Sequence, residues 1–66
     1  MSAYQIMNRL ITNLNRQYDE GRINEAKYQT TANTYLARLK VFYGCGDLTD
    51  EEYPELIAKL KTFEEA

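Results

Sequence analysis

A motif that occurs twice, 25 residues apart, constrains the fold of this chain more than any other feature. Each copy holds a tyrosine, a glycine, an aliphatic residue, a polar residue and a second tyrosine at fixed spacing. The copies are Tyr18-x-x-Gly21-x-Ile23-Asn24-x-x-x-Tyr28 and Tyr43-x-x-Gly46-x-Leu48-Thr49-x-x-x-Tyr53. Glycine commonly follows the end of a helix, and Asn or Thr commonly precedes the start of one. Two copies therefore predict two turns that divide the chain into three helices.

Apolar residues recur at steps of three and four in each of the three segments, which is the spacing of a helix with one buried face. The expected helices cover about residues 3–20, 24–43 and 50–64. Their apolar stripes are Ala3, Tyr4, Met7, Leu10, Ile11, Leu14 and Tyr18 in the first; Tyr28, Ala32, Tyr35, Leu36, Leu39, Phe42 and Tyr43 in the second; and Tyr53, Leu56, Ile57, Leu60 and Phe63 in the third.

The starts of the second and third helices carry recognisable caps. Asn24 can accept a hydrogen bond from the first turn of the second helix. Thr49 and Glu52 have the spacing of a capping box, in which each side chain bonds the backbone N–H of the other residue. Pro54 follows within the third helix, where its missing N–H removes one early hydrogen bond. Ile23 and Leu48, between glycine and cap, are expected to fill the base of each turn.

Three amphipathic helices with short connections predict an all-α fold, a three-helix antiparallel bundle that makes residues 1–66 a single domain. An alternative is a long hairpin of the first two helices that forms a homodimer, with the third helix folded over one end. A domain of this size buries only about 60% of the surface that its unfolded chain exposes. A partner or a second copy would therefore add needed stability.

The second copy of the motif resembles the SHOCT domain, a short helical module with the pattern Gly-x-Ile/Leu-Thr-x-x-Glu-Phe/Tyr before a helix rich in Lys and Leu. The matching residues are Gly46, Leu48, Thr49, Glu52 and Tyr53, and Pro54 departs from the pattern. The first copy matches at Gly21, Ile23 and Tyr28 and departs at Asn24 and Lys27. Similar hairpins occur in small bacteriophage proteins. The resemblance implies oligomerisation or protein contact more than any reaction.

The composition offers little for catalysis. There is no histidine, the usual proton shuttle at neutral pH and the commonest metal ligand. Cys45 lies between two glycines and is expected to be an inert turn residue, with an intermolecular disulfide or a redox role as alternatives. The glycine turns fail as calcium loops, because Tyr18 and Tyr43 would occupy ligand positions. We therefore expect no enzyme activity, no metal and no cofactor.

Charge is distributed unevenly along the chain. Residues 1–44 carry six cations and three acids, whereas residues 45–66 carry two cations and seven acids. One explanation is that the acids at residues 50–52 stabilise the positive end of the third helix. The alternative is an acidic surface, here called the acidic knob, that binds a basic groove on a partner or covers a nucleic-acid site. Its residues are Asp47, Asp50, Glu51, Glu52 and Glu55.

A second candidate surface lies mainly on the first helix, whose polar face is rich in Asn, Thr and Arg. A solvated face is one explanation, and a contact surface of hydrogen-bond donors is the other. Tyrosine is frequent at binding hot spots, and two of the six tyrosines lie outside the repeated motif. The candidate partner-binding residues outside the acidic knob are Tyr4, Asn8, Arg9, Asn15, Arg16 and Tyr35.

Together these features favour a small, non-enzymatic protein-binding module. A phage- or mobile-element-encoded inhibitor or adaptor of a host protein fits them, with anti-CRISPR-type inhibition as one option. The alternatives are a self-assembling structural, virion or scaffold component and a nucleic-acid-binding helix-turn-helix regulator. Direct nucleic-acid binding is disfavoured, because the third helix begins with acids. Without a membrane-spanning run or a signal-like amino terminus, we expect a cytoplasmic protein, in the host cell cytoplasm if phage-encoded.

Overall fold

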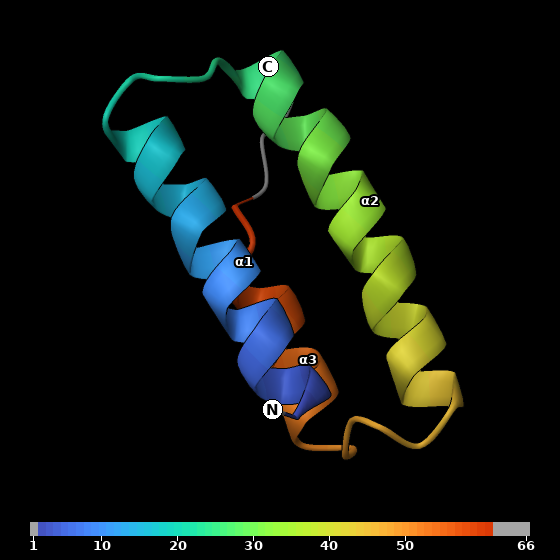
Figure 1. The fold of residues 1–66 in the computed structure, drawn as a ribbon. Helices are drawn as coiled ribbons and strands as arrows, with labels where there is room; N and C mark the ends of the chain where they lie inside the picture. Colours follow the sequence, from blue (N-terminus) through green and yellow to red (C-terminus); the bar gives the residue numbers. More distant parts are fainter. Residues whose placement is uncertain (1, 62–66) are drawn as a thin grey trace.

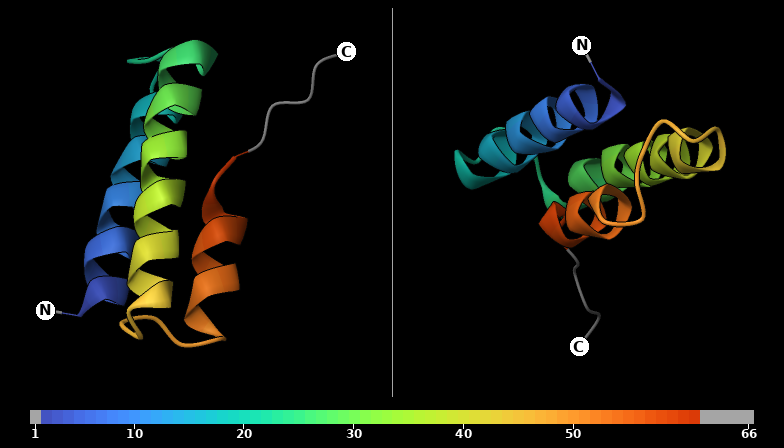
Figure 2. Two further views of the ribbon diagram at one scale, coloured as in Figure 1. Left: turned by 90° about the vertical axis from the view of Figure 1, so that its right-hand side faces the viewer. Right: turned by 90° about the horizontal axis from the view of Figure 1, so that it is seen from below.

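The computed structural model describes residues 2–61, which form three α-helices and no strand. These are α1 (Ala3–Asp19), α2 (Glu25–Gly44) and α3 (Glu52–Lys59). The first two lie side by side and antiparallel, and the shorter α3 runs beside the N-terminal part of α1 (Figure 1). Seen along the helices, the three stand at the corners of a triangle, with α3 on one side of the α1–α2 pair (Figure 2). The predicted three-helix antiparallel bundle is confirmed.

Both copies of the repeated motif end a helix in the same way. Gly21 and Gly46 have φ values of 75° and 83°, in the left-handed region that favours glycine. In the first copy the N–H of Arg22 donates to the carbonyl of Gln17 at 2.9 Å, and the second copy repeats this bond at 2.8 Å. The glycine N–H donates to the carbonyl three residues back in each case. These bonds define a Schellman motif, which satisfies carbonyls that the ending helix leaves unpaired.

The two tyrosines of each copy contact one another, which explains their fixed spacing. The rings of Tyr18 and Tyr28 meet edge to face with centroids 5.4 Å apart. Those of Tyr43 and Tyr53 stack with centroids 4.5 Å apart and planes 7° apart. Each pair joins the last turn of one helix to the first turn of the next. The motif therefore encodes a complete corner: a helix ending, a cap and an aromatic pair across it.

Hydrogen-bonding caps begin α1 and α2. Asn24 accepts a hydrogen bond from the N–H of Lys27 at 2.8 Å, as predicted. At the start of α1, Ser2 Oγ accepts from the N–H of Gln5 at 3.2 Å, and the N–H of Ser2 donates to Gln5 Oε1 at 3.1 Å. This second capping box uses Gln in place of Glu and was not predicted.

The third helix is shorter than the predicted residues 50–64. The capping box is confirmed, because Thr49 and Glu52 exchange two hydrogen bonds of 3.0 Å. The helix nevertheless starts at Glu52, since Pro54 has no N–H to donate to the carbonyl of Asp50. It ends at Lys59, and the next residue is extended. The prediction of helix at residues 60 and 61 is wrong, and residues 62–64, with Phe63 of the predicted stripe, lie outside the described residues.

The core comes entirely from the predicted stripes and turn plugs. Nine apolar residues are buried: Met7, Ile11, Leu14, Tyr28, Ala32, Leu39, Leu48, Leu56 and Leu60. The other predicted stripe residues among those described pack around them and remain partly exposed, except Tyr43, which is 39% exposed and does not pack against the core. Ile23, the plug of the first turn, is half-buried, whereas Leu48, the plug of the second, is fully part of the core.

Two glycines of the second turn provide a matched pair of substitutions. Gly46→Ala is expected to lower the free energy of unfolding by about 1 kcal/mol or more, because alanine disfavours positive φ. Gly44→Ala, in the last turn of α2, is expected to raise it by about 0.5–1 kcal/mol, because alanine is the better helix former. An added Cβ meets no atom within 4 Å at either site, so the comparison isolates backbone conformation. Urea titration measures both values, and shifts in the same direction would contradict this account.

Candidate functional site

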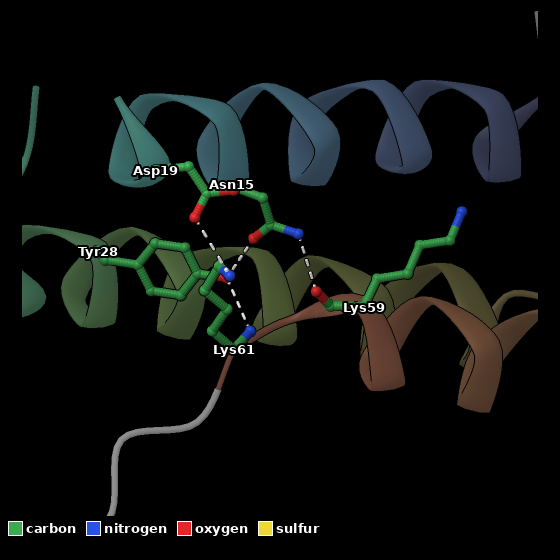
Figure 3. Close-up of polar contacts among 5 residues, drawn as sticks. All are labelled: Asn15, Asp19, Tyr28, Lys59 and Lys61. Carbon is green, nitrogen blue, oxygen red and sulfur yellow. Dashed lines mark hydrogen bonds and ion pairs between the residues drawn. The ribbon is translucent and has the colours of Figure 1, made fainter. Parts of the chain in front are cut away.

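A hydrogen-bond network around Tyr28 joins all three helices (Figure 3). The hydroxyl of this fully buried side chain donates to Asn15 Oδ1 at 2.5 Å and accepts from the N–H of Lys61 at 2.8 Å. Asn15 Nδ2 in turn donates to the carbonyl of Lys59 at 2.9 Å. If α3 were longer, the Lys59 carbonyl and the Lys61 N–H would bond within the helix; here Asn15 and Tyr28 bond them instead. The network therefore explains why α3 ends at Lys59.

The Lys61 side chain also reaches α1. Its ammonium group lies 3.3 Å from Asp19 Oδ1 and 5.9 Å from the centroid of the Tyr18 ring. Both charged side chains are partly exposed, so the ion pair itself stabilises the fold by less than about 1 kcal/mol. Together with the backbone bond to Tyr28, it holds the chain against α1 and α2 after α3 has ended (Figure 3).

Two further candidate residues lie in the contact between α1 and α3. Lys59 Nζ donates a hydrogen bond to Asn8 and lies 6.0 Å from the centroid of the Tyr4 ring. The Glu55 carboxylate accepts a hydrogen bond from the Tyr4 hydroxyl and thereby raises the pKa of that tyrosine. Tyr4, Asn8 and Asn15 were predicted to contact a partner. The structure turns all three toward α3, and their polar groups bond within the chain.

The acidic knob divides into residues that bond locally and residues that face solvent. Asp50 Oδ1 accepts a hydrogen bond of 2.6 Å from the Tyr43 hydroxyl, and this bond raises the pKa of Tyr43. Glu52 belongs to the α3 capping box. Glu55 interacts with the Tyr4 hydroxyl of α1, whereas Asp47 and Glu51 are exposed. Asp50 and Glu52 thus stabilise the second corner and the start of α3. This agrees with the explanation that the acids of the knob stabilise the beginning of the third helix.

The side of the α1–α2 pair opposite α3 is hollowed. At about 100° per residue, Leu10 and Gln17 lie about 160° around α1 from Asn8 and Asn15, which face α3. A hollow of about 210 Å³ opens there between the two helices. It is lined by Leu10, Asn13, Leu14, Gln17, Ile23, Lys27, Thr31 and Tyr35. Of the predicted contact residues, Tyr35 is the one that lines it.

A second, more open hollow of about 480 Å³ lies at the other end of the same side. It is lined by Ser2, Ala3, Ile6, Phe42, Gly46 and Asp47. Ile6 is 39% exposed, and Val41, next to Phe42, is 62% exposed. We call the residues that line the two hollows, together with Val41, the α1–α2 face. No helix of residues 2–61 covers this face (Figure 2).

The α1–α2 face lies among positive charges. Arg9 is exposed and lies three residues from Ile6 and four from Asn13, at the edge of the face. Arg38 is exposed and follows Tyr35 by three residues, and Lys27 lines the smaller hollow. Asp47, which lines the larger hollow, is the one acid among the residues that line the two hollows.

Most of the α1–α2 face was not among the predicted site residues. Tyr35 and Asp47 were predicted and line it, and the structure leaves the predicted Arg9 and Arg16 exposed outside the two linings. Ile6 and Val41 were missed, although the sequence holds a signal for them: each is a large aliphatic residue outside the stripe of its helix. Such a residue has no place in the core of its own chain, so its exposure could have been expected.

No helix in residues 2–61 is both long enough and apolar enough to span a bilayer. Within the same residues, no group of three His, Cys, Asp or Glu side chains is arranged to hold a metal ion. Comparison of the chain with protein-family models, curated proteins and solved structures found no match, so the resemblance to the SHOCT domain stays a prediction.

Proposed function

We propose that this chain is a non-enzymatic protein-binding module that contacts its partner through the α1–α2 face. The observation that carries the proposal is the exposure of Ile6, which lines the larger hollow, and of Val41, which lies about 60° around α2 from Arg38, on the side of the helix pair that α3 leaves open. Exposed apolar residues beside hollows and rimmed by polar groups are typical of protein interaction sites.

The shape of the face favours a macromolecule over a small ligand. Small-molecule sites are concave and enclose most of the ligand surface. The two hollows here are open and follow one another along the helices, the first between Tyr35 and Leu10 and the second between Phe42 and Ile6. An elongated partner segment can cover both hollows together. A module that only binds suits the role of a stoichiometric inhibitor or adaptor of another protein, including one that a phage directs at its host.

Val41→Asp tests the proposal with little risk to the fold, because the side chain is 62% exposed. The variant is expected to bind the natural partner at least about tenfold more weakly, since a carboxylate must be desolvated in the interface. The partner is first identified by crosslinking and affinity purification from the source cell, and its affinity is then measured by calorimetry with purified proteins.

Thr12→Asp is the matched control for this experiment. Thr12 is exposed on α1 and lies about 120° around the helix from Ile6, away from the α1–α2 face. This variant is expected to bind the partner as the unaltered protein does. If Val41→Asp and Thr12→Asp bind equally well, the α1–α2 face is not the interface.

A further inference from the structure

Resting on the proposed function, we infer that the partner presents an acidic amphipathic helix to the α1–α2 face. The inference names the chemistry and the shape of the partner segment. It depends on the spacing of the two hollows, on the charges beside them and on the polar groups that line the smaller one.

The hollows are spaced as the side chains of a docking helix are. On α1 the smaller hollow is lined by residues 10–17 and the larger by residues 2–6, so their centres lie about ten residues apart. At 1.5 Å per residue the two hollows are therefore separated by about 15 Å along the helix axes. Apolar side chains at positions i and i+11 of a third helix have nearly the same separation. A helix lying along the face can place one such side chain in each hollow.

The charges beside the face determine which helix is preferred. Arg9 and Arg38 flank the stretch between the two hollows, and Lys27 lines the smaller one. Carboxylates on either side of the apolar stripe of a docking helix would meet these cations, whereas lysines would be repelled. Asp47 lines the larger hollow, and no acid lines the smaller one. The Asp47 carboxylate favours a docked helix whose N-terminal end, which is the positive end of its dipole, lies at the larger hollow.

The polar lining of the smaller hollow matches the same partner. Asn13 and Gln17 stand beside Lys27, and each carries an N–H group that can donate to a carboxylate. The hollow thus combines an apolar floor of Leu10 and Leu14 with a rim of donors. Glutamate side chains next to an apolar anchor suit this arrangement.

A second copy of the chain suits the face poorly. Consider a two-fold dimer in which the two α1–α2 faces meet centre to centre. Arg9 and Arg38 lie at the same level between the hollows, so Arg38 would lie opposite Arg38 of the second copy if the helices of the two copies ran antiparallel. It would lie opposite Arg9 if they ran parallel. Like charges placed opposite one another across an interface weaken association.

Two designed peptides of about 18 residues test the inference. Both carry leucines at i, i+4, i+7 and i+11; one has glutamates at the flanking positions and the other has lysines. Fluorescence anisotropy measures their binding to the full chain. The glutamate peptide is expected to bind at least about tenfold more tightly than the lysine peptide, and the difference should shrink as salt is added.

Charge reversal on the protein provides the decisive comparison. The double variant Lys27→Glu/Arg38→Glu is expected to reverse the preference between the peptides, and circular dichroism checks that it remains helical. Arg16→Glu/Lys40→Glu is the control: it makes the same charge change at two exposed positions that do not line either hollow. Equal binding of the two peptides, or an unchanged preference in the double variant, would overturn the inference.

Failure of the inference is distinguishable from failure of the proposed function. If Val41→Asp abolishes binding of the natural partner but neither peptide is preferred, the face binds protein of another kind. If neither the partner nor a peptide depends on Val41, both proposals fail. A dimer seen by light scattering and lost in Val41→Asp would assign the face to a second copy. Retention on duplex DNA that is lost in Lys27→Glu/Arg38→Glu would assign it to nucleic acid.

Discussion

Leu39→Ala is expected to leave the domain largely unfolded under conditions in which the unaltered chain is folded. Leu39 is fully buried in the core. Removing such a side chain costs about 2–5 kcal/mol in lost burial and cavity formation. The core of a domain this small supplies only about 3–5 kcal/mol of net stability, so the two quantities are comparable. Far-UV circular dichroism during urea titration measures the change.

Val41→Ala is the control for this prediction. It also shortens an aliphatic side chain of α2, but one that is 62% exposed. The free energy of unfolding is expected to change by less than about 0.5 kcal/mol. If the two variants lose the same stability, the assignment of Leu39 to the core is wrong.

Tyr28→Phe is expected to lower the free energy of unfolding by about 1–3 kcal/mol, although it removes one oxygen atom and keeps the ring. The hydroxyl donates to Asn15 and accepts from the N–H of Lys61, and both of these groups lose a partner in the variant. A partly buried polar group left without a hydrogen bond costs most of its desolvation energy. Thermal unfolding followed by circular dichroism measures the loss, and exchange of the Lys61 amide should accelerate.

Tyr35→Phe is the matched control for Tyr28→Phe. Tyr35 also lies on α2 and is half-buried, but its hydroxyl has no hydrogen bond to the rest of residues 2–61. This variant is expected to be nearly as stable as the unaltered chain. Equal losses in the two variants would show that the Tyr28 hydroxyl contributes nothing beyond its ring.

The features that the sequence predicted well depend on local chemistry. Gly21 and Gly46 end helices because each adopts positive φ, and Asn24 and Thr49 begin them because their side chains bond the backbone three residues on. All nine core residues follow from helical periodicity or from the motif. Each of these predictions needs only a few neighbouring residues, so tertiary packing had little opportunity to override it.

The end of α3 could not be predicted in this way. Periodicity continues through Leu60 to Phe63, and nothing nearby in the sequence stops the helix. The groups that stop it are the Asn15 amide and the Tyr28 hydroxyl, which lie 44 and 33 residues away from the backbone groups that they bind. Such partners are visible only once the fold brings them together.

The candidate site shows the same division. Helix periodicity separates polar from apolar faces, but it does not say which polar face a neighbouring helix will cover. Tyr4, Asn8 and Asn15 became α3 contacts because α3 packs on their side of α1. Ile6 and Val41 stayed exposed because no helix of residues 2–61 packs on the other side. The position of α3 therefore decides which predicted contact residues remain available to a partner.

The shortness of α3 has a consequence for the order of folding. A helix of eight residues is too short to persist alone in water, so α3 is helical only while it is docked. Its anchors Asn15 and Tyr28 are remote in sequence from the groups that they bind, whereas α1 and α2 are joined directly by a short turn. Closing the longer loop costs more chain entropy, so α3 is the last element to join and the first to detach. The α1–α2 face can thus outlast a local opening that releases the opposite side.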